Sequence, residues 1–256
     1  MLFDVHAHYD DERFDEDRDI ILSSMLDNNV GHIINIGYNL KSSRDSIALS
    51  EKYPFMYAAV GFHPSDAHLM TKEDFDEIKK LAQHPKVVAI GEIGLDYYYG
   101  KETEEVQRRV FREQIELAKE VNLPFQVHNR DSTRDCVDIL RESNMGERRG
   151  MMHCFSESRE TAKKILDLGM KISIGGVLTF KNNVKTVEVV KYVPIEDLMI
   201  ETDCPYLAPV PYRGKRNSSL YIHAVAEKIA ELKGMDVDEV IAITEKNAKN
   251  FFDIKD

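Results

Sequence analysis

Residues 125–142 read FQVHNRDSTRDCVDILRE, a short apolar run followed by a longer amphipathic stretch. Phe125–His128 has the length and composition of a buried strand, and Ser132–Glu142 is the helix that we expect to follow it. The same alternation recurs along almost the whole chain. This stretch is therefore one unit of a repeating β–α pattern.

Seven further units have this form, and one additional helix follows them. Short strands that are apolar on both faces are typical of a parallel sheet covered by helices. Such alternation fits an open doubly wound sheet or a closed barrel. Eight units in 256 residues favour the closed form, because a (β/α)₈ TIM barrel typically takes about 250 residues. We predict one α/β domain over residues 1–256, a TIM barrel with an extra C-terminal helix.

The remaining predicted strands are Leu2–His6, His32–Ile36, Met56–Val60, Val87–Ile90, Gly150–His153, Lys171–Ile174 and Leu198–Glu201. The remaining predicted helices are Asp17–Asn29, Ser42–Lys52, Glu73–Gln83, Glu104–Val121, Arg159–Leu168, Val184–Tyr192 and Ser219–Lys233, with Val237–Phe251 as the extra one. No G-x-G-x-x-G motif or P-loop follows any predicted strand, so the sequence does not favour an enzyme that uses a nucleotide cofactor.

Charge and cysteine content narrow the function classes. The formal net charge of −11 argues against a protein that coats nucleic acid with a broad basic surface. It leaves room for an enzyme that binds one or two phosphates where metal ions supply positive charge. Cys136, Cys154 and Cys204 form no CxxC pair, so we expect neither a disulfide framework nor a thiolate zinc site.

The location follows from what the chain lacks. Widely spaced cysteines favour a reducing compartment. The first residues lack the basic and then apolar regions of a signal peptide, and no stretch approaches about 18 consecutive apolar residues. We expect a soluble, cytoplasmic protein with no membrane contact and no obligate protein partner.

His6 and His8 close the first predicted strand. Residues two apart on a strand share a face, so both imidazoles point inward while Ala7 points to the helices. Two imidazoles at one strand end can bind one divalent ion. Asp4, one step deeper, is expected to accept a hydrogen bond from a ligand imidazole. Two ordinary surface histidines are the alternative, but His-x-His directly after an apolar run is unusual for them.

Polar side chains also end four later strands. Chemistry in a TIM barrel lies at the carboxyl ends of its strands. Glu92 follows an apolar run, where a carboxylate is costly to bury unless it is paired or coordinated. His128 and His153 end successive strands, and Asp203 follows the eighth strand, which returns beside the first when the barrel closes. A lone residue of this kind could be a satisfied polar group; the repetition indicates a metal site.

Four imidazoles and two carboxylates exceed the needs of one four-coordinate ion with an open position. They fit two ions that share Glu92, and two ions about 3.5–4 Å apart activate water and stabilise the attacking and leaving oxygens. Asp203 is placed to take the proton from that water, so Asp203 and Glu92 are the predicted catalytic residues. Nitrogen and oxygen ligands without thiolate admit Mg, Mn, Zn, Co or Fe. The predicted ligands are His6, His8 and Asp203 for one ion and His128 and His153 for the other, with Glu92 between them.

Three further residues are predicted to contact the substrate. His63 lies just beyond the third strand and faces the barrel mouth, where a substrate contact is favoured over a metal ligand. Arg213 and Arg216 belong to a loop with three cations in four residues after the eighth strand. A solvated loop is the alternative, but the position beside Asp203 favours phosphate contacts.

Four motifs together resemble the TatD family of metal-dependent deoxyribonucleases: DVHAH at 4–8, GEIGLDYY at 91–98, HCFS at 153–156 and ETDCPYLAP at 201–209. The resemblance runs in order from Met1 to Phe252. It implies a two-metal barrel hydrolase that cleaves phosphodiester bonds of DNA and trims single strands from the 3′ end. It also implies that the six residues above are the metal ligands, with Asp203 as the general base and the arginine loop near phosphates.

The chain departs from the family pattern at one place. Family members commonly continue the basic loop as Arg-Asn-Glu-Pro, whereas this chain has Arg216-Asn217-Ser218-Ser219. The change leaves the ligand set intact and bears on substrate contacts or rate. A smaller departure is the absence of the Gly often found before Ser158.

Two alternatives remain open. One is a related dinuclear barrel hydrolase that cleaves an ester, a lactone or an amide, because this fold hosts many reactions. The other is a non-catalytic protein whose ion stabilises the barrel. Structural metal sites tend to be closed and saturated, whereas these residues lie at an open barrel mouth, and this difference favours an enzyme.

Overall fold

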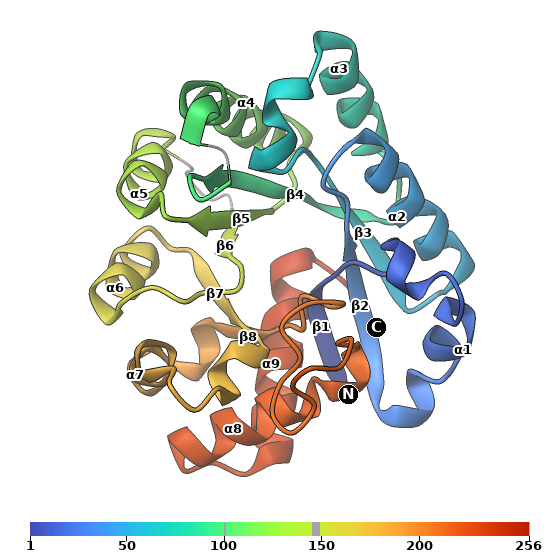
Figure 1. Cartoon of the computed structure of the whole chain (residues 1–256), viewed down its shortest axis with the longest axis vertical. Coiled ribbons are helices and arrows are strands. Elements are labelled where there is room, and N and C mark those ends of the chain that lie inside the picture. Colours follow the sequence, from blue (N-terminus) through green and yellow to red (C-terminus); the bar gives the residue numbers. More distant parts are fainter. Residues whose placement is uncertain (100, 145–148, 256) are drawn as a thin grey trace.

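Eight parallel strands lie side by side in chain order from β1 to β8, as the repeating pattern predicts. Figure 1 shows the strands as a ring with the helices outside it. The computed structural model describes residues 1–99, 101–144 and 149–255. The strands are β1 (Leu2–Ala7), β2 (Val30–Ile36), β3 (Met56–Val60), β4 (Val87–Asp96), β5 (Phe125–Arg130), β6 (Gly150–Met152), β7 (Lys171–Ile174) and β8 (Leu198–Ile200).

The helices between the strands confirm the (β/α)₈ class, and α9 is the predicted extra helix. They are α1 (Arg18–Ser23), α2 (Leu40–Lys52), α3 (Lys72–Leu81), α4 (Glu104–Val121), α5 (Thr133–Glu142), α6 (Arg159–Asp167), α7 (Val184–Tyr192), α8 (His223–Lys233) and α9 (Val237–Phe252). Short 3₁₀ helices are η1 (Glu12–Phe14), η2 (Leu26–Asn28), η3 (Pro64–Leu69), η4 (Lys101–Thr103), η5 (Gly176–Thr179), η6 (Ile195–Asp197) and η7 (Ser219–Tyr221). Among the described residues, none of these helices has the length and apolar character needed to span a bilayer.

The barrel closes just beyond the end of β8. The backbone N–H of His8 donates to the carbonyl of Cys204 at 2.8 Å, and that of Asp203 donates to the carbonyl of His6 at 2.9 Å. Ala7 and Cys204 form an isolated parallel bridge. These bonds bring the segment after β8 directly beside the end of β1.

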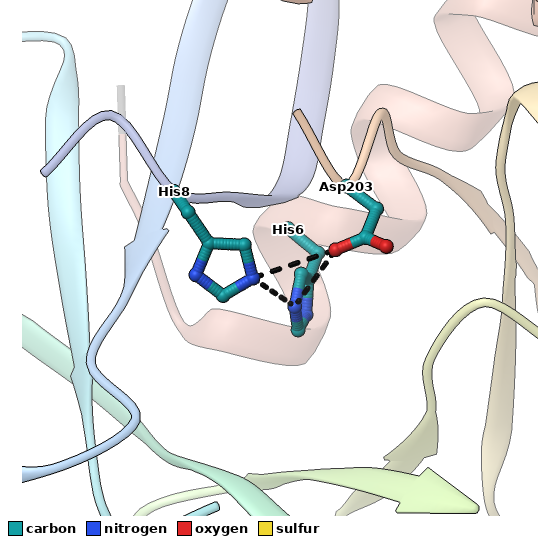
Figure 2. Close-up of side chains that lie close together, drawn as sticks. All are labelled: His6, His8 and Asp203. Carbon is teal, nitrogen blue, oxygen red and sulfur yellow. Dashed lines mark hydrogen bonds and ion pairs between the residues drawn. The ribbon is translucent and has the colours of Figure 1, made fainter. Parts of the chain in front are cut away.

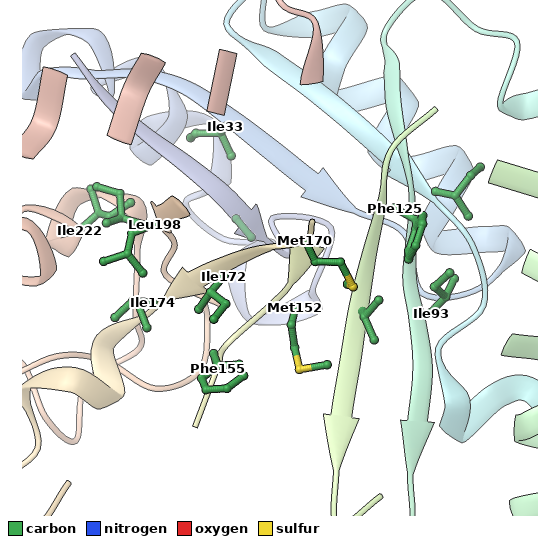
Figure 3. Packing of buried hydrophobic residues seen from close by; sticks show 14 of the residues in the cluster. Ile33, Ile93, Phe125, Met152, Phe155, Met170, Ile172, Ile174, Leu198 and Ile222 are labelled. Atoms are coloured by element: carbon green, nitrogen blue, oxygen red, sulfur yellow. The ribbon is translucent and has the colours of Figure 1, made fainter. Parts of the chain in front are cut away.

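Two apolar clusters support the ring. The larger one lies between strands and helices, and Figure 3 shows Phe125, Met152, Ile172 and Leu198 within it. The smaller one takes side chains from β1, β2, β3, β4, β6 and β8 and is joined by Phe251 and Phe252 of α9. The final helix therefore packs onto the barrel interior, away from the strand ends that carry the polar residues.

Several predicted elements differ from the structure, and the helix predicted over Ser219–Lys233 is one of them, since it divides into η7 and α8. The helix predicted over Asp17–Asn29 is split into α1 and η2, since the Ser24 hydroxyl donates to the carbonyl of Ile21 at 2.7 Å and competes with a continuing helix. Strand β4 runs to Asp96 rather than ending at Ile90, because the residues after Ile90 pair with β5. Glu92 thus lies inside a strand and not after one.

Candidate metal centre

A cleft of about 540 Å³ opens at the carboxyl ends of the strands. This is the end at which barrel chemistry is expected. Its lining comes from β4, β5 and the segments after β1, β2, β3 and β8. The lining residues are His8, Asp11, Tyr38, His63, Ser65, Glu92, Asp96, Tyr99, His128, Arg130, Asp203 and Tyr206.

One pair of imidazoles comes from the end of β1. The Nε2 atoms of His6 and His8 lie 3.2 Å apart, and Asp203 Oδ1 is 3.8 Å from the first and 3.4 Å from the second (Figure 2). Two nitrogens that each bind one ion at about 2.1 Å are about 3.0–3.4 Å apart. The spacing of this pair therefore suits one shared ion.

A second pair comes from β5 and the end of β6. His128 Nδ1 and His153 Nε2 lie 3.3 Å apart, again within the range for one shared ion. Glu92 Oε1 is 2.7 Å from each of these nitrogens. The structure brings these three residues together, as the sequence predicts.

Glu92 lies between the two pairs. Its other oxygen, Oε2, is 3.6 Å from His6 Nε2 and 3.8 Å from His8 Nε2. Burial raises the pKa of Glu92, but the surrounding histidines lower it more, so the net pKa falls well below its usual value. A charged carboxylate thus presents one oxygen to each pair of imidazoles.

The first pair has its outer nitrogens held by uncharged acceptors. His6 Nδ1 is 2.8 Å from the amide oxygen of Gln126, and His8 Nδ1 is 3.1 Å from the carbonyl of Ile36. The Gln126 amide is oriented by the 3.1 Å bond that its Nε2 donates to Val5 O. Around a bound ion, each ring would carry its proton on the outer nitrogen and turn a lone pair toward the ion.

The second pair has its outer nitrogens facing carboxylates. His128 Nε2 is 3.1 Å from Asp96 Oδ2, and His153 Nδ1 is 3.5 Å from Glu201 Oε1. Glu201 is fully buried and accepts a hydrogen bond from the Ser173 hydroxyl through its other oxygen. Around a bound ion, these two rings would likewise turn their lone pairs inward.

Two other combinations of side chains offer ligand atoms within 4.8 Å of one another, namely His63 with Glu92 and His128, and His6 with His153 and Glu201. The second of these is less suited to an ion. The His6 Nδ1 nitrogen is already engaged by Gln126, and Glu201 faces the outer nitrogen of His153. Glu201 is therefore better described as the residue that orients His153.

His63 has the opposite arrangement from these four histidines. Its Nδ1 accepts the backbone N–H of Ser65 at 3.1 Å, and burial lowers its pKa to about 3. The neutral ring must then carry its proton on Nε2, which lies in the cleft 3.6 Å from Glu92 Oε1. His63 offers a hydrogen-bond donor where the others offer lone pairs, which suits a substrate contact.

Asp203 and Gly94 have backbone conformations that place site residues. Asp203 has a left-handed backbone with φ of 56°, a conformation that costs free energy and is common at functional sites. Gly94 has φ of 143°, and a Cβ there would lie 2.0 Å from the carbonyl of His128. A glycine at this point lets β4 approach β5 closely beside His128.

The prediction that Asp4 accepts a hydrogen bond from a ligand imidazole was wrong. Its carboxylate accepts from the Thr202 hydroxyl and the Ser219 hydroxyl, both at 2.6 Å, and from the backbone of His6, not from an imidazole. The pairing register shifts between Asp4 and Ala7, so simple alternation does not hold there. Asp4 instead ties β1 to the connection after β8.

The serines of the divergent loop belong to the same buried network. The Ser219 hydroxyl donates to Asp4, and the Tyr9 hydroxyl lies 3.0 Å from Ser219 Oγ and 3.3 Å from Ser218 Oγ. Both serines are buried. At the position where the family pattern has Glu-Pro, this chain has two small polar residues that join the β8–α8 connection to β1.

Arg213 and Arg216 lie outside the cleft lining. The Arg216 guanidinium donates to Asp17 Oδ2 at 2.6 Å and to the carbonyl of Arg13. The Arg213 guanidinium lies 3.8 Å from the centre of the Phe180 ring. The guanidinium that lines the cleft belongs to Arg130, on the same strand as His128.

Sequence reasoning missed four residues of the site: Gln126, Asp96, Glu201 and Arg130. Gln126 and Arg130 each lie two residues from His128 on β5, so the period of two was a usable signal. Asp96 lies four residues after Glu92, beyond Gly94, and Glu201 directly follows β8. For these two no local signal distinguishes an orienting carboxylate from a solvated one.

Comparison with known proteins gives consistent matches. A family model described as TatD related DNase matches residues 3–253. A relative from Bacillus subtilis named uncharacterized metal-dependent hydrolase YabD is 48% identical over 254 residues, which cover 99% of this chain and 100% of the relative. A relative from Salmonella typhimurium named 3′-5′ ssDNA/RNA exonuclease TatD is 31% identical over 258 residues, with 99% of each chain covered.

The fold has a close match among solved structures. The structure of YJJV, a TatD homologue from Escherichia coli, superposes with a TM-score of 0.93 at 28% identity and covers 99% of this chain and 98% of its own. The barrel expected from the β–α repeat is confirmed by this match.

Proposed function

This chain is a metal-dependent hydrolase of the TatD family, and from that premise we propose that it is a 3′–5′ exonuclease acting on single-stranded DNA with two divalent ions. The family resemblance predicted from its motifs is confirmed by the match over residues 3–253. The nuclease activity is the part that needs testing. It is supported by the name of the Salmonella relative and by the chemistry of the cleft.

We assign one ion to His6, His8 and Asp203 and the other to His128 and His153, with Glu92 offering one oxygen to each. The observation that carries this assignment is the spacing of the facing ring nitrogens, 3.2 Å in one pair and 3.3 Å in the other, with a Glu92 oxygen beside each pair. A divalent ion between each pair would be bound by both nitrogens and by the carboxylate together. The ligand chemistry admits Mg, Mn, Zn, Co or Fe.

Divalent ions at these two points would supply an activated water and stabilise charge on the attacking and leaving oxygens of a phosphodiester. Asp203 would accept the proton of that water. Burial raises the pKa of Asp203, but the hydrogen bond with His8 and the nearby imidazoles lower it by more than burial raises it. The net pKa is therefore below its usual value, and the carboxylate is charged. Only one of its oxygens is turned toward His6 and His8 (Figure 2).

The charge of the cleft supports a phosphate substrate only when cations are bound. Among the described residues that line it, Asp11, Glu92, Asp96 and Asp203 carry carboxylates and Arg130 carries a guanidinium. A bare cleft of this charge would repel a phosphodiester, and bound ions reverse that sign. His63 would donate a hydrogen bond from its Nε2–H group to a phosphate oxygen. Arg213 and Arg216 would contact phosphates farther along the DNA strand.

The test is cleavage of 5′-end-labelled single-stranded DNA by the wild type with Mg²⁺ or Mn²⁺, with EDTA, and by Asp203→Asn. We expect metal-dependent shortening from the 3′ end that the variant loses. Glu116→Gln, on the exposed face of α4, is the matched control and should keep full activity. An unlabelled RNA competitor tests whether ribose is also accepted. No cleavage of any nucleic acid, together with metal-dependent turnover of an aryl ester or a lactone, would overturn the nuclease assignment.

A further inference from the structure

Two groups of exposed tyrosines stand at opposite sides of the cleft. Tyr98 and Tyr99 follow β4 and expose 58% and 72% of their surface, and Tyr206 follows β8 and exposes 44%. Tyr99 and Tyr206 both line the cleft. β4 and β8 are four strands apart in the eight-stranded ring and lie on opposite sides of it (Figure 1), so the two groups follow strands on opposite sides of the barrel mouth.

Each group contains an arginine stacked on the aromatic ring. The Arg130 guanidinium lies 3.9 Å from the centre of the Tyr98 ring and 4.8 Å from that of Tyr99. The Arg13 guanidinium lies 4.2 Å from the centre of the Tyr206 ring. An arginine over an exposed tyrosine ring offers an aromatic surface and a positive charge to a ligand. We name these the β4 platform (Tyr98, Tyr99 and Arg130) and the β8 platform (Tyr206 and Arg13).

The β4 platform is fixed relative to the metal centre. Asp96 Oδ1 accepts the backbone N–H groups of Tyr98 and Tyr99, both at 3.0 Å, while Asp96 Oδ2 faces His128 Nε2. One carboxylate therefore orients a candidate metal ligand and the two tyrosines together.

The β8 platform is fixed in the same way on the other side. The Tyr206 backbone N–H donates to the carbonyl of Asp203 at 2.9 Å, and its ring meets that of His8 edge-on with centres 6.4 Å apart. Asp11 joins the pair, because it accepts from the Arg13 Nε at 3.0 Å and from the Tyr206 hydroxyl at 3.3 Å. Both platforms are thus attached to residues that face the reacting position.

We propose that the two platforms stack the unpaired nucleobases on either side of the scissile phosphate, so that base stacking selects single strands. This inference rests on the proposed nuclease function and adds the residues that determine its substrate form. Every base offers a π face, so aromatic stacking binds single strands with little sequence preference. Bases within a duplex are covered by their neighbours and cannot enter between the platforms.

The charge of the platforms fits the same substrate. The charged residues of the cleft lining are mostly carboxylates, and Arg130 adds positive charge on the β4 side, whereas the charge of Arg13 is paired with Asp11. Guanidinium groups also stack on bases and contact phosphates. A DNA strand that crosses the cleft would then meet a cation on the β4 side, a guanidinium that can stack on the β8 side and metal ions at the centre.

The test compares two strands that differ only in their bases. One is an ordinary single-stranded oligonucleotide, and the other has abasic residues at the two 3′-terminal positions but the same phosphates. We expect the wild type to cleave the ordinary strand with a kcat/KM about 10-fold or more above that for the abasic strand. The variant Tyr98→Leu/Tyr99→Leu should lose most of this preference while its metal content stays unchanged.

Two controls separate stacking from general damage. Tyr99→Phe keeps the ring and should keep the preference. Tyr192→Leu removes the ring of another tyrosine–arginine pair, formed with Arg159 at 4.5 Å outside the cleft lining, and should behave as the wild type. The inference would be overturned if kcat/KM of the leucine variant fell by the same factor on the ordinary and the abasic oligonucleotide, or fell on neither.

A binding measurement distinguishes failure of the inference from failure of the proposed function. Anisotropy of labelled phosphorothioate strands, with and without bases, reports stacking without cleavage. Base-dependent binding that needs the tyrosines, without any cleavage, would overturn the nuclease function and support the platforms. Cleavage with base-independent binding would overturn the stacking role of the platforms alone. If neither cleavage nor base-dependent binding is found, both the nuclease function and the stacking role are overturned.

Discussion

The two imidazole pairs that face Glu92 are oriented by different kinds of acceptor. His6, on β1, and His8, directly after it, are buried, and their outer nitrogens lie beside an amide oxygen and a backbone carbonyl. His128 and His153 face the carboxylates of Asp96 and Glu201. Asp203 lies directly beside the first pair, whereas the second pair has its extra negative charge behind the rings.

This difference shows that one site can supply negative charge to its two prospective ion positions in two different ways. On the β1 side the anion lies among the prospective ligands, so neutral acceptors are sufficient behind the imidazoles. On the β5–β6 side a carboxylate behind each ring raises the basicity of the imidazole instead. The second arrangement leaves the inner side of His128 free of a further carboxylate and open to the cleft. We expect substrate to approach from that side.

Glu92→Gln should have the largest effect, because it removes the charge that both sides share. We expect a loss of about 1000-fold or more in kcat and fewer bound ions per chain. Steady-state kinetics and elemental analysis of the dialysed protein measure the two quantities. Glu102→Gln, on η4, is the control for a surface carboxylate. Full metal content with unchanged kcat would show that Glu92 is not shared.

His8→Ala and His128→Ala should separate the two sides. If each pair holds its own ion, each variant should lose about one ion per chain and retain the other. Metal titration by calorimetry on the two variants checks this, with His68→Ala as the control. Loss of both ions in both variants would mean that the two positions bind as one unit.

Asp96→Asn and Gln126→Leu compare the two kinds of acceptor. Removing the charge behind His128 should weaken metal binding or activity by about 10- to 100-fold. Removing the amide behind His6 should have a smaller effect on the charge of the ring and mainly disturb its orientation. The ratio of metal affinities for the two variants is the measurement. A larger loss in Gln126→Leu would contradict the comparison.

Metal binding should strengthen as pH rises. In the ion-free site burial lowers the pKa of His8, but Asp203 and Glu92 raise it more, to about 9. Below that value a proton competes with the ion for the imidazole, so the apparent metal affinity should rise by up to about tenfold per pH unit and level off above it.

The stability of the ion-free protein should fall as pH rises, because a raised histidine pKa contributes stability that is lost as pH rises from about 6.5 to about 9. Calorimetric titration and thermal unfolding in EDTA check both trends.

Much of the architecture is already present in the local sequence. The alternation of apolar strands with amphipathic helices predicts the barrel, and each strand of a barrel contributes its carboxyl end to one face. The six predicted ligands could therefore be grouped before their distances were known: His6, His8, Glu92, His128, His153 and Asp203. Residue type and position along a strand are local properties, and they are sufficient for this step.

The contacts around those residues depend on which strands become neighbours. Pairing with β5 extends β4 past Glu92 to Asp96, and only then does Asp96 reach His128. A register shift in β1 turns Asp4 toward the β8 connection, and barrel closure brings Asp203 to His6. Hydrogen bonds between segments far apart in the chain leave no periodic signal in either segment. The sequence thus identifies the prospective metal ligands, and the folded chain decides what orients each of them.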